Sequence, residues 1–348
     1  MSFMIDEIEQ QPSVLERTLR KELPRIEAFR RRISHRSIDY VCLVARGTSD
    51  NAAVFGRYLI ETSTGLPAAL AAPSVTTLYG VRPRWKNALV VALSQSGEST
   101  DTNIYVQEAR EAGALTVGIT NEKSSSLTRL VDEVFLVHAG REKSVAATKT
   151  YTGQLLMLYL LAYALGAPIT PKTLERLPGL AARALRSKKR VAALSERYRF
   201  MNHAVVVGRG LNYANAFELS LKMMETCYVI AERFSGADFL HGPIALVERA
   251  FPVFVFASPG PTRDTTSDTL RRLGQLEAET IVIGEKCDEA TRSVVVSGGA
   301  SVPSGCPADL LTPIPYIIPA QLFCAFLAEQ KGLDPDHPRT LTKVTWTV

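Results

Sequence analysis

Two halves of this chain carry the same short motifs at one constant spacing, and that repeat most limits how it can fold. Three motifs recur 163 residues further along the chain: Arg46-Gly47 as Arg209-Gly210, Gly97 with Asp101 as Gly260 with Asp264, and Glu122-Lys123 as Glu285-Lys286. One shared dipeptide would be coincidence. Three matches at one offset, each just past an apolar run, indicate an internal duplication. We therefore expect two copies of one folding unit.

Short runs rich in valine, isoleucine and leucine alternate with helical patterns in both halves. Such runs are typical of parallel strands that helices bury on both faces. The pattern predicts an α/β fold in which each half is a three-layer αβα sandwich around a parallel sheet, flavodoxin-like or Rossmann-like. The expected strands are Tyr40–Ala45, Ala88–Leu93, Leu115–Thr120 and Val134–Val137 in the first half, and Ala204–Gly208, Pro252–Ala257 and Thr280–Gly284 in the second.

The same patterns predict how the chain is divided. Residues 1–35 read as a helical lead, with Pro12 near a helix start, and 36–168 as the first domain. A linker over 169–200 contains the prolines Pro171 and Pro178 and then a basic helical segment. The second domain is expected over 201–336, followed by a C-terminal tail over 337–348.

Composition and charge exclude several classes of function. The 348 residues are 46% hydrophobic and 22% charged with a net charge of +5, and no block of lysine and arginine suggests nucleic acid. The apolar stretch Leu155–Ile169 is too short to span a membrane and predicts a buried helix. No secretory signal is visible at the N-terminus. Five scattered cysteines and five separated histidines predict reduced thiols, no metal site and a cytoplasmic protein.

Two hydroxyl-rich loops follow expected strands in the first half. Ser94-Gln95-Ser96-Gly97-Glu98-Ser99 precedes a helix start, and Gly47-Thr48-Ser49 takes the same position after the first strand. Hydroxyls, glycine and the free N–H groups of a helix start suit a phosphate, although helix caps and turns favour the same residues. The counterpart of the longer loop, residues 257–262, contains two prolines and has lost two backbone donors.

Three further groups have both a structural and a functional interpretation. Glu218, Lys222 and Glu225 share one helix face, where they form either a surface ion pair or a carboxylate poised by a lysine for proton transfer. His241, beside a Gly-Pro turn, is either structural or catalytic. Lys343 is either a solvated terminal lysine or, if buried, a nucleophile.

Several segments together resemble the sugar isomerase (SIS) domain family, over almost the whole chain. They are ARGTSDNA, LSQSGESTDT, VAATKTYTGQL, HGPIALVE, HPRTLTKVTWTV and the opening MIDEIEQQPSVLERTL. In their two-copy arrangement they are similar to the isomerase half of glucosamine-6-phosphate synthase. The resemblance implies two tandem SIS domains.

The resemblance also implies roles for individual residues. The phosphate would be held by Ser49, Ser94, Gln95, Ser96 and Ser99, while Val145 and Ala147 approach the sugar. Glu225 would be the proton-transfer base, supported by Glu218 and Lys222. His241, donated by the neighbouring subunit of a homodimer, would open the sugar ring, and Lys343 could form a Schiff base with the open-chain ketone. No cofactor is implied.

This sequence departs from the family pattern at a few positions. Ala147 stands where the family usually has serine, and Asp238 and Leu240 where glutamate and lysine are common. Residue 2 is serine, whereas the synthase has a nucleophilic cysteine at the start of a glutaminase domain. We therefore expect a stand-alone enzyme of the glucosamine-6-phosphate deaminase type.

Three hypotheses follow for the function. The first is conversion of glucosamine 6-phosphate to fructose 6-phosphate and ammonia. The second is synthase-type amination with free ammonia, or action on a related galactosamine or fructosamine phosphate. The third is a non-catalytic sugar-phosphate sensor, against which stands the absence of a DNA-binding element in the first 35 residues.

Overall fold

The computed structural model describes residues 2–296 and 302–343, and these divide into two compact units by packing. The N-terminal unit contains residues 13–142, residues 149–175 and, at the end of the described chain, Thr342 and Lys343. The C-terminal unit contains residues 176–296 and 302–341, residues 2–12 and the short segment Lys143–Thr148. The domain boundaries expected from the sequence remain a prediction.

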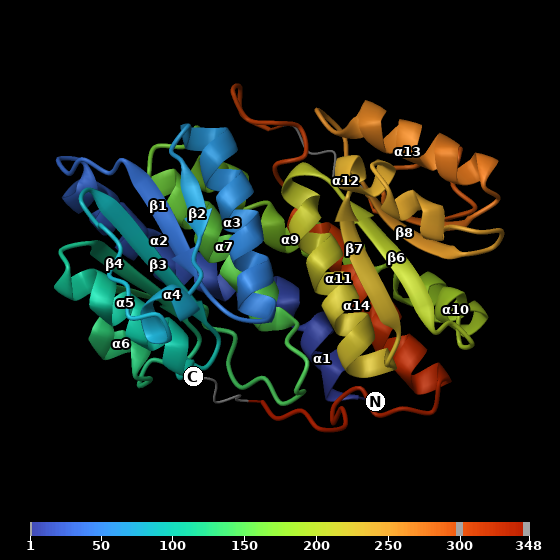
Figure 1. Cartoon of the computed structure of the whole chain (residues 1–348), viewed down its shortest axis with the longest axis horizontal. Coiled ribbons are helices and arrows are strands. Elements are labelled where there is room, and N and C mark those ends of the chain that lie inside the picture. The colour runs from blue at the N-terminus through green and yellow to red at the C-terminus, as the bar shows by residue number, and fades with distance from the viewer. Residues whose placement is uncertain (1, 297–301, 344–348) are drawn as a thin grey trace. The chain divides into compact units, whose positions relative to one another are not determined.

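The N-terminal unit is built on a five-stranded parallel sheet with strand order β2-β1-β3-β4-β5 (Figure 1). Its strands are β1 (Tyr40–Val44), β2 (Ala68–Leu70), β3 (Ala88–Ser94), β4 (Leu115–Thr120) and β5 (Glu133–Leu136). Its helices are α2 (Gln11–Ile33), α3 (Thr48–Thr64), α4 (Ser74–Thr77), α5 (Thr100–Glu111), α6 (Leu127–Leu130), α7 (Lys149–Ala164) and α8 (Pro171–Leu174).

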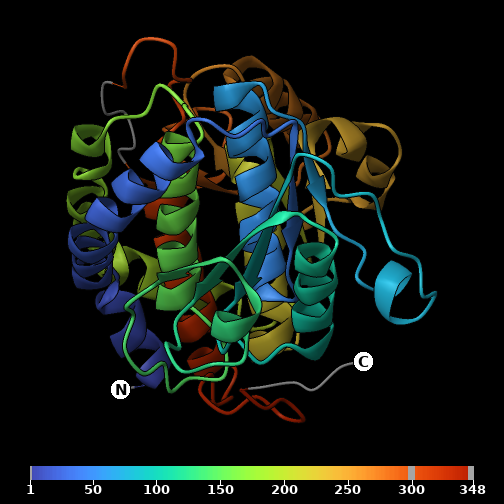
Figure 2. The same ribbon diagram turned by 90° about the vertical axis from the view of Figure 1, so that its left-hand side faces the viewer.

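Alternate residues of one strand face opposite helical layers. Cys42 and Val44 of β1 belong to a cluster that packs under α5, whereas Leu43 approaches Gly56 of α3, which also meets Leu158 of α7. Burial on both faces explains why β1, β3 and β4 are mostly apolar. Helix α4, light blue in Figure 2, lies on a loop that extends away from the sheet.

The C-terminal unit repeats this topology with strand order β7-β6-β8-β9-β10 (Figure 1). Its strands are β6 (His203–Gly208), β7 (Ile230–Ser235), β8 (Pro252–Ala257), β9 (Glu279–Gly284) and β10 (Arg292–Val295). Its helices are α1 (Phe3–Glu9), α9 (Leu177–Leu185), α10 (Lys188–Arg197), η1 (Gly210–Asn212), α11 (Tyr213–Cys227), α12 (Gly236–Leu240), η2 (Pro243–Leu246), α13 (Arg263–Gln275) and α14 (Pro313–Gln330).

The α/β fold with two parallel sheets is the one expected from the sequence. All seven predicted strands form, and the structure adds β2, β7 and β10, which lie at sheet edges. These three strands are partly exposed, so they lack the continuous apolar run that marks a central strand. The apolar stretch after Lys149 is the buried helix α7, and no helix in the described ranges is long and apolar enough to cross a membrane. The five cysteines are unpaired, and Cys42, Cys227 and Cys324 are buried.

Candidate functional site

The two hydroxyl-rich loops meet at one edge of the N-terminal sheet. Gly47–Ser49 joins β1 to α3, and Ser94–Ser99 joins β3 to α5. Strands β1 and β3 are parallel neighbours, so both loops leave the carboxyl edge side by side. The connections from these strands run to opposite sides of the sheet order, which makes this the switch point where open α/β sheets bind ligands.

Two backbone carbonyls of the longer loop bond inward to the protein. The carbonyl of Gln95 accepts the Asn121 N–H at 3.1 Å, and that of Gly97 accepts the Leu127 N–H at 3.0 Å and the Asn103 side-chain amide at 3.1 Å. Gly97 has φ +67°, and a Cβ there would lie 2.1 Å from the Ser125 hydroxyl. Only glycine fits this position.

Beside these two inward-bonded carbonyls, the loop presents N–H groups at the start of α5. Within the described residues, the backbone N–H groups of Ser96, Ser99 and Thr100 donate to no acceptor. Free N–H groups at a helix start carry partial positive charge and bind anions. The geometry of this loop therefore suits a phosphate.

The shorter loop is held from behind by α7. Gly47 has φ +56° and precedes the first turn of α3. The buried Ser49 hydroxyl accepts a 2.9 Å hydrogen bond from the side-chain amide of Gln154. Ser49 thus keeps one orientation before any ligand arrives.

The equivalent place in the C-terminal unit is filled by the protein's own side chains. The Asn212 amide donates to the hydroxyls of Ser258 and Thr312, both at 2.7 Å, and all three residues are buried. A Cβ built on Gly210 would lie 3.7 Å from a carboxylate oxygen of the buried Asp309. A second phosphate would meet a carboxylate there, besides the lost donors expected from the two prolines.

Helix α11 brings Glu218, Lys222 and Glu225 together in the C-terminal unit. The Lys222 Nζ lies 2.5 Å from Glu225 Oε2 and 3.4 Å from Glu218 Oε1. The side chains of Glu218 and Lys222 are 0% and 1% exposed, whereas that of Glu225 is 24% exposed. The surface ion pair considered from the sequence is therefore wrong, because this face of α11 packs against α14 and β7 (Figure 1).

Charge compensation keeps the buried Lys222 protonated. Burial alone would lower the pKa of Lys222, but the carboxylates of Glu218 and then Glu225 outweigh burial and raise that pKa above its usual value. The group is a lysinium ion bonded to two carboxylates. It supplies a fixed positive charge beside Glu225, the only one of the three that solvent reaches appreciably.

Three other predicted site residues also lie in the C-terminal unit. His241 is exposed and ends α12. Val145 and Ala147 are partly exposed in the segment Lys143–Thr148, which is anchored where the Val145 N–H donates to the Asp336 carbonyl at 3.1 Å.

Lys343 belongs to the N-terminal unit, where its Nζ donates to Glu142 Oε2 at 2.8 Å. Glu142 is fully buried and also accepts from the N–H and hydroxyl of Thr150, at 3.1 and 2.8 Å, in the first turn of α7. Lys343 is 26% exposed, so it is neither fully buried nor freely solvated. The motif residues 344–348 lie outside the described residues.

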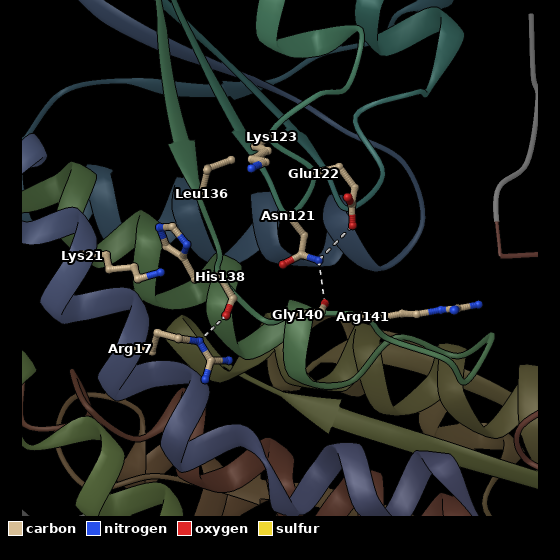
Figure 3. Close-up of a pocket in the computed structure, with 9 residues that line it drawn as sticks. All are labelled: Arg17, Lys21, Asn121, Glu122, Lys123, Leu136, His138, Gly140 and Arg141. Atoms are coloured by element: carbon tan, nitrogen blue, oxygen red, sulfur yellow. Dashed lines mark hydrogen bonds between the residues drawn. The ribbon is translucent and has the colours of Figure 1, made fainter.

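A further pocket of about 750 Å³ lies beyond β4 and β5 (Figure 3). In it, the Arg17 guanidinium donates to the His138 carbonyl at 2.7 Å, and the Asn121 amide donates to the Gly140 carbonyl at 2.9 Å. None of the predicted substrate residues lines this pocket. Its lining consists of Arg17, Lys21, Asn121, Glu122, Lys123, Leu136, His138, Gly140 and Arg141.

Sequence reasoning missed two residues that hold the predicted ones in place. Gln154 binds Ser49 and Glu142 binds Lys343. Gln154 is a polar residue within the apolar pattern of α7, which was a usable signal. Glu142 gives no such signal, because its partners lie 8 and 201 residues away along the chain.

The model of the SIS domain matches residues 36–164 and 199–293. Glutamine–fructose-6-phosphate aminotransferase (isomerizing) of Methanothermobacter thermautotrophicus is 33% identical over 341 residues, which cover 98% of this chain and 57% of that protein. The chain thus spans little more than half the length of the curated relatives it matches.

Two solved structures share the fold. The C-terminal domain of glucosamine-fructose-6-phosphate aminotransferase from Francisella tularensis has a TM-score of 0.85 at 26% identity, over 97% of this chain and 98% of that one. Glucosamine-6-phosphate deaminase from Thermotoga maritima has a TM-score of 0.80 at 22% identity, over 99% and 100%.

The family match spans both sheets, and the relatives align from one end of the described fold to the other. The chain belongs to the SIS domain family, with one SIS domain on each of its two parallel sheets.

Proposed function

We propose that this protein is an isomerase of amino-hexose 6-phosphates that converts glucosamine 6-phosphate and water to fructose 6-phosphate and ammonia. The observation that carries the proposal is the array on α11, where a buried lysinium holds Glu225 while leaving that carboxylate partly accessible. The names of the relatives given above refer to fructose 6-phosphate or glucosamine 6-phosphate, which supports a hexose 6-phosphate as the substrate.

Each step of the proposed reaction has a residue suited to it. The loops at Gly47–Ser49 and Ser94–Ser99 bind the phosphate, and Val145 and Ala147 approach the sugar. His241, supplied by the partner subunit of a homodimer, opens the ring. Glu225 then removes a proton from one of the two adjacent carbons C1 and C2 and returns it to the other.

Glu218 and Lys222 act through Glu225. Lys222 lies 2.5 Å from Glu225 Oε2 and so holds in place the carboxylate that accepts the proton in the proposed reaction. In the proposed reaction, Lys343 breaks its hydrogen bond to Glu142 and forms a Schiff base with the carbonyl of the open-chain sugar. The same residues run the reaction in reverse when free ammonia is abundant, so both directions belong in the test.

The test is an assay of ammonia and fructose 6-phosphate released from glucosamine 6-phosphate, with the reverse reaction started from fructose 6-phosphate and an ammonium salt. Glu225→Gln should lower kcat by roughly 10²–10⁴, the usual share of a general base. Glu232→Gln, on an exposed glutamate of the same unit, is the matched control and should retain full activity.

A panel of galactosamine, fructosamine and glucosamine phosphates identifies the sugar. If another phosphosugar is turned over and Glu225→Gln abolishes that turnover, the substrate assignment changes while the assignment of the catalytic site stands. Thermal stabilisation by phosphosugars without any turnover would refute the enzymatic proposal in favour of a sensor.

A further inference from the structure

The two phosphate-loop regions are joined by one ion pair. The Arg46 side chain, between β1 and α3, donates through Nε to Asp101 Oδ2 at 2.8 Å and through a terminal nitrogen to the same oxygen. Asp101 lies in the first turn of α5, directly after the loop Ser94–Ser99. The pair therefore connects Arg46, just before the loop Gly47–Ser49, to Asp101, just after the loop Ser94–Ser99.

The backbone of Arg46 is fixed at the same time. Its carbonyl accepts the N–H groups of Ser49 at 3.2 Å and Asp50 at 3.4 Å, which begins α3. Burial raises the pKa of Asp50, and the positive charge of Arg46 opposes that rise. Arg46 thus contacts the first loop through its main chain and the second region through its guanidinium.

Burial differs sharply between the two partners. The Asp101 side chain is 3% exposed and that of Arg46 is 50% exposed. A buried carboxylate is costly unless a charged donor accompanies it, and Arg46 supplies such a donor to Asp101. The half-exposed Arg46 side chain can be replaced with little loss of packing, so the effect of its substitution should appear mainly in the two loops.

The internal duplication supplies a natural comparison. Arg209 and Asp264 occupy the matching positions 163 residues later, and Asp264 also lies in the first turn of its helix, α13. Within the described residues these two form no ion pair, and Asp264 is exposed. The pair forms in the copy whose loop retains free N–H donors and is missing from the copy whose loop contains prolines.

We propose that Arg46 is a positioning residue that, through Asp101, ties the two loops together so that they bind one phosphate as a single preorganised site. The inference rests on the proposed function for the identity of the ligand. Preorganisation lowers the cost of ordering the loops when the ligand binds, so the tie increases affinity for phosphorylated sugars over plain sugars.

The binding test uses sorbitol 6-phosphate, which carries the phosphate but no carbonyl and cannot be turned over. Arg46→Met and Asp101→Asn should each raise its Kd about tenfold, which corresponds to about 1.4 kcal/mol. Arg46→Lys should recover only part of the affinity, because lysine keeps the positive charge but cannot make the forked contact. The matched variants Arg209→Met and Asp264→Asn should leave Kd unchanged.

The sign of the Asp101→Asn effect separates a tie from direct charge attraction. Removing a carboxylate near a phosphate should strengthen binding if charge alone matters. Weaker binding supports the tie, whereas unchanged or tighter binding overturns it. An equal loss in the Arg209 and Asp264 variants would also overturn it, as it would indicate general destabilisation.

A ligand-free measurement keeps this inference separate from the proposed function. Amide hydrogen exchange at residues 94–99 should accelerate in Arg46→Met and Asp101→Asn but not in the two matched variants. If the wild-type protein bound no phosphosugar, the proposed function would fail. The exchange measurement would still show whether Arg46 and Asp101 hold the two loops together. Exchange that is equal in all four variants and the wild type would refute it.

Discussion

Lys222 is a cation held where solvent scarcely reaches, and its two partners differ in a way that matters for chemistry. Glu218 is completely buried and Glu225 is partly accessible. A buried charge persists only when it is paired, so Glu218 and Lys222 require each other. The pairing leaves Glu225 as the one carboxylate of the array that can meet a substrate.

Lys222→Met should cost about 3–5 kcal/mol of unfolding free energy, because it leaves the Glu218 carboxylate buried without a counter-ion. Urea unfolding followed by circular dichroism measures the loss. Adding Glu218→Leu to Lys222→Met should restore part of the stability, since no unpaired buried charge remains. The exposed Lys189 provides the control, and Lys189→Met should change the free energy by less than about 0.5 kcal/mol. A similar loss in both lysine variants would contradict the role of burial.

At the scale of an element, the loop after β3 depends on one backbone conformation. Gly97→Ala would introduce both a left-handed strain of about 1–2 kcal/mol and a clash with the Ser125 hydroxyl. Gly113 also has a positive φ but has no atom within 4 Å of an added Cβ. Gly113→Ala should therefore show the strain alone.

We expect Gly97→Ala to lose more stability than Gly113→Ala and to lose phosphosugar binding, which Gly113→Ala retains. Thermal unfolding with and without sorbitol 6-phosphate measures both effects. Equal ligand-induced shifts in the two variants would show that the loop does not bind the phosphate.

The degenerate loop region of the C-terminal unit carries its own electrostatic consequence. Burial raises the pKa of Asp309 from 3.8 to about 6. The folded state therefore binds this proton more tightly than the unfolded state does. The ionised carboxylate destabilises the fold, and this destabilisation grows as pH rises from about 3.8 and is complete above about 6.

Asp309→Asn should stabilise the protein at pH 7.5 by up to about 3 kcal/mol, from roughly 1.4 kcal/mol per pKa unit. The gain should shrink steadily as pH is lowered toward 4, where the wild-type carboxyl becomes protonated. Urea unfolding over that pH range is the measurement. A gain that does not vary with pH would mean that burial of the charge is not its cause.

At the scale of the whole molecule, the proposed homodimer makes a prediction about how sites are shared. His241→Asn and Glu225→Gln should each retain about 1% or less of the wild-type activity alone. If His241 comes from the partner, co-refolding the two variants should restore about a quarter of the wild-type activity, because about half of the dimers are mixed and each of these has one intact site. Activity that stays absent in the mixture would show that both residues serve the site from one subunit.

The repeat and the apolar runs were enough to predict the α/β fold, its central strands and its duplication. Local patterns carry that information, because a strand buried on both faces is mostly apolar along its length. The same reasoning located the loops at Gly47–Ser49 and Ser94–Ser99, which simply follow such strands. The same reasoning did not predict the edge strands β2, β7 and β10, because they are partly exposed and include polar or isolated residues rather than a long apolar run.

Only the tertiary structure decided which charged residues are buried and with whom. Sequence spacing placed Glu218 and Lys222 on one helix face, but the packing of α11 against α14 turned that face inward. The pairs Arg46–Asp101 and Glu142–Lys343 span 55 and 201 residues, and no local pattern marks them. Burial and charge pairing arise from contacts between elements distant along the chain, whereas strands, helices and turns follow from neighbouring residues.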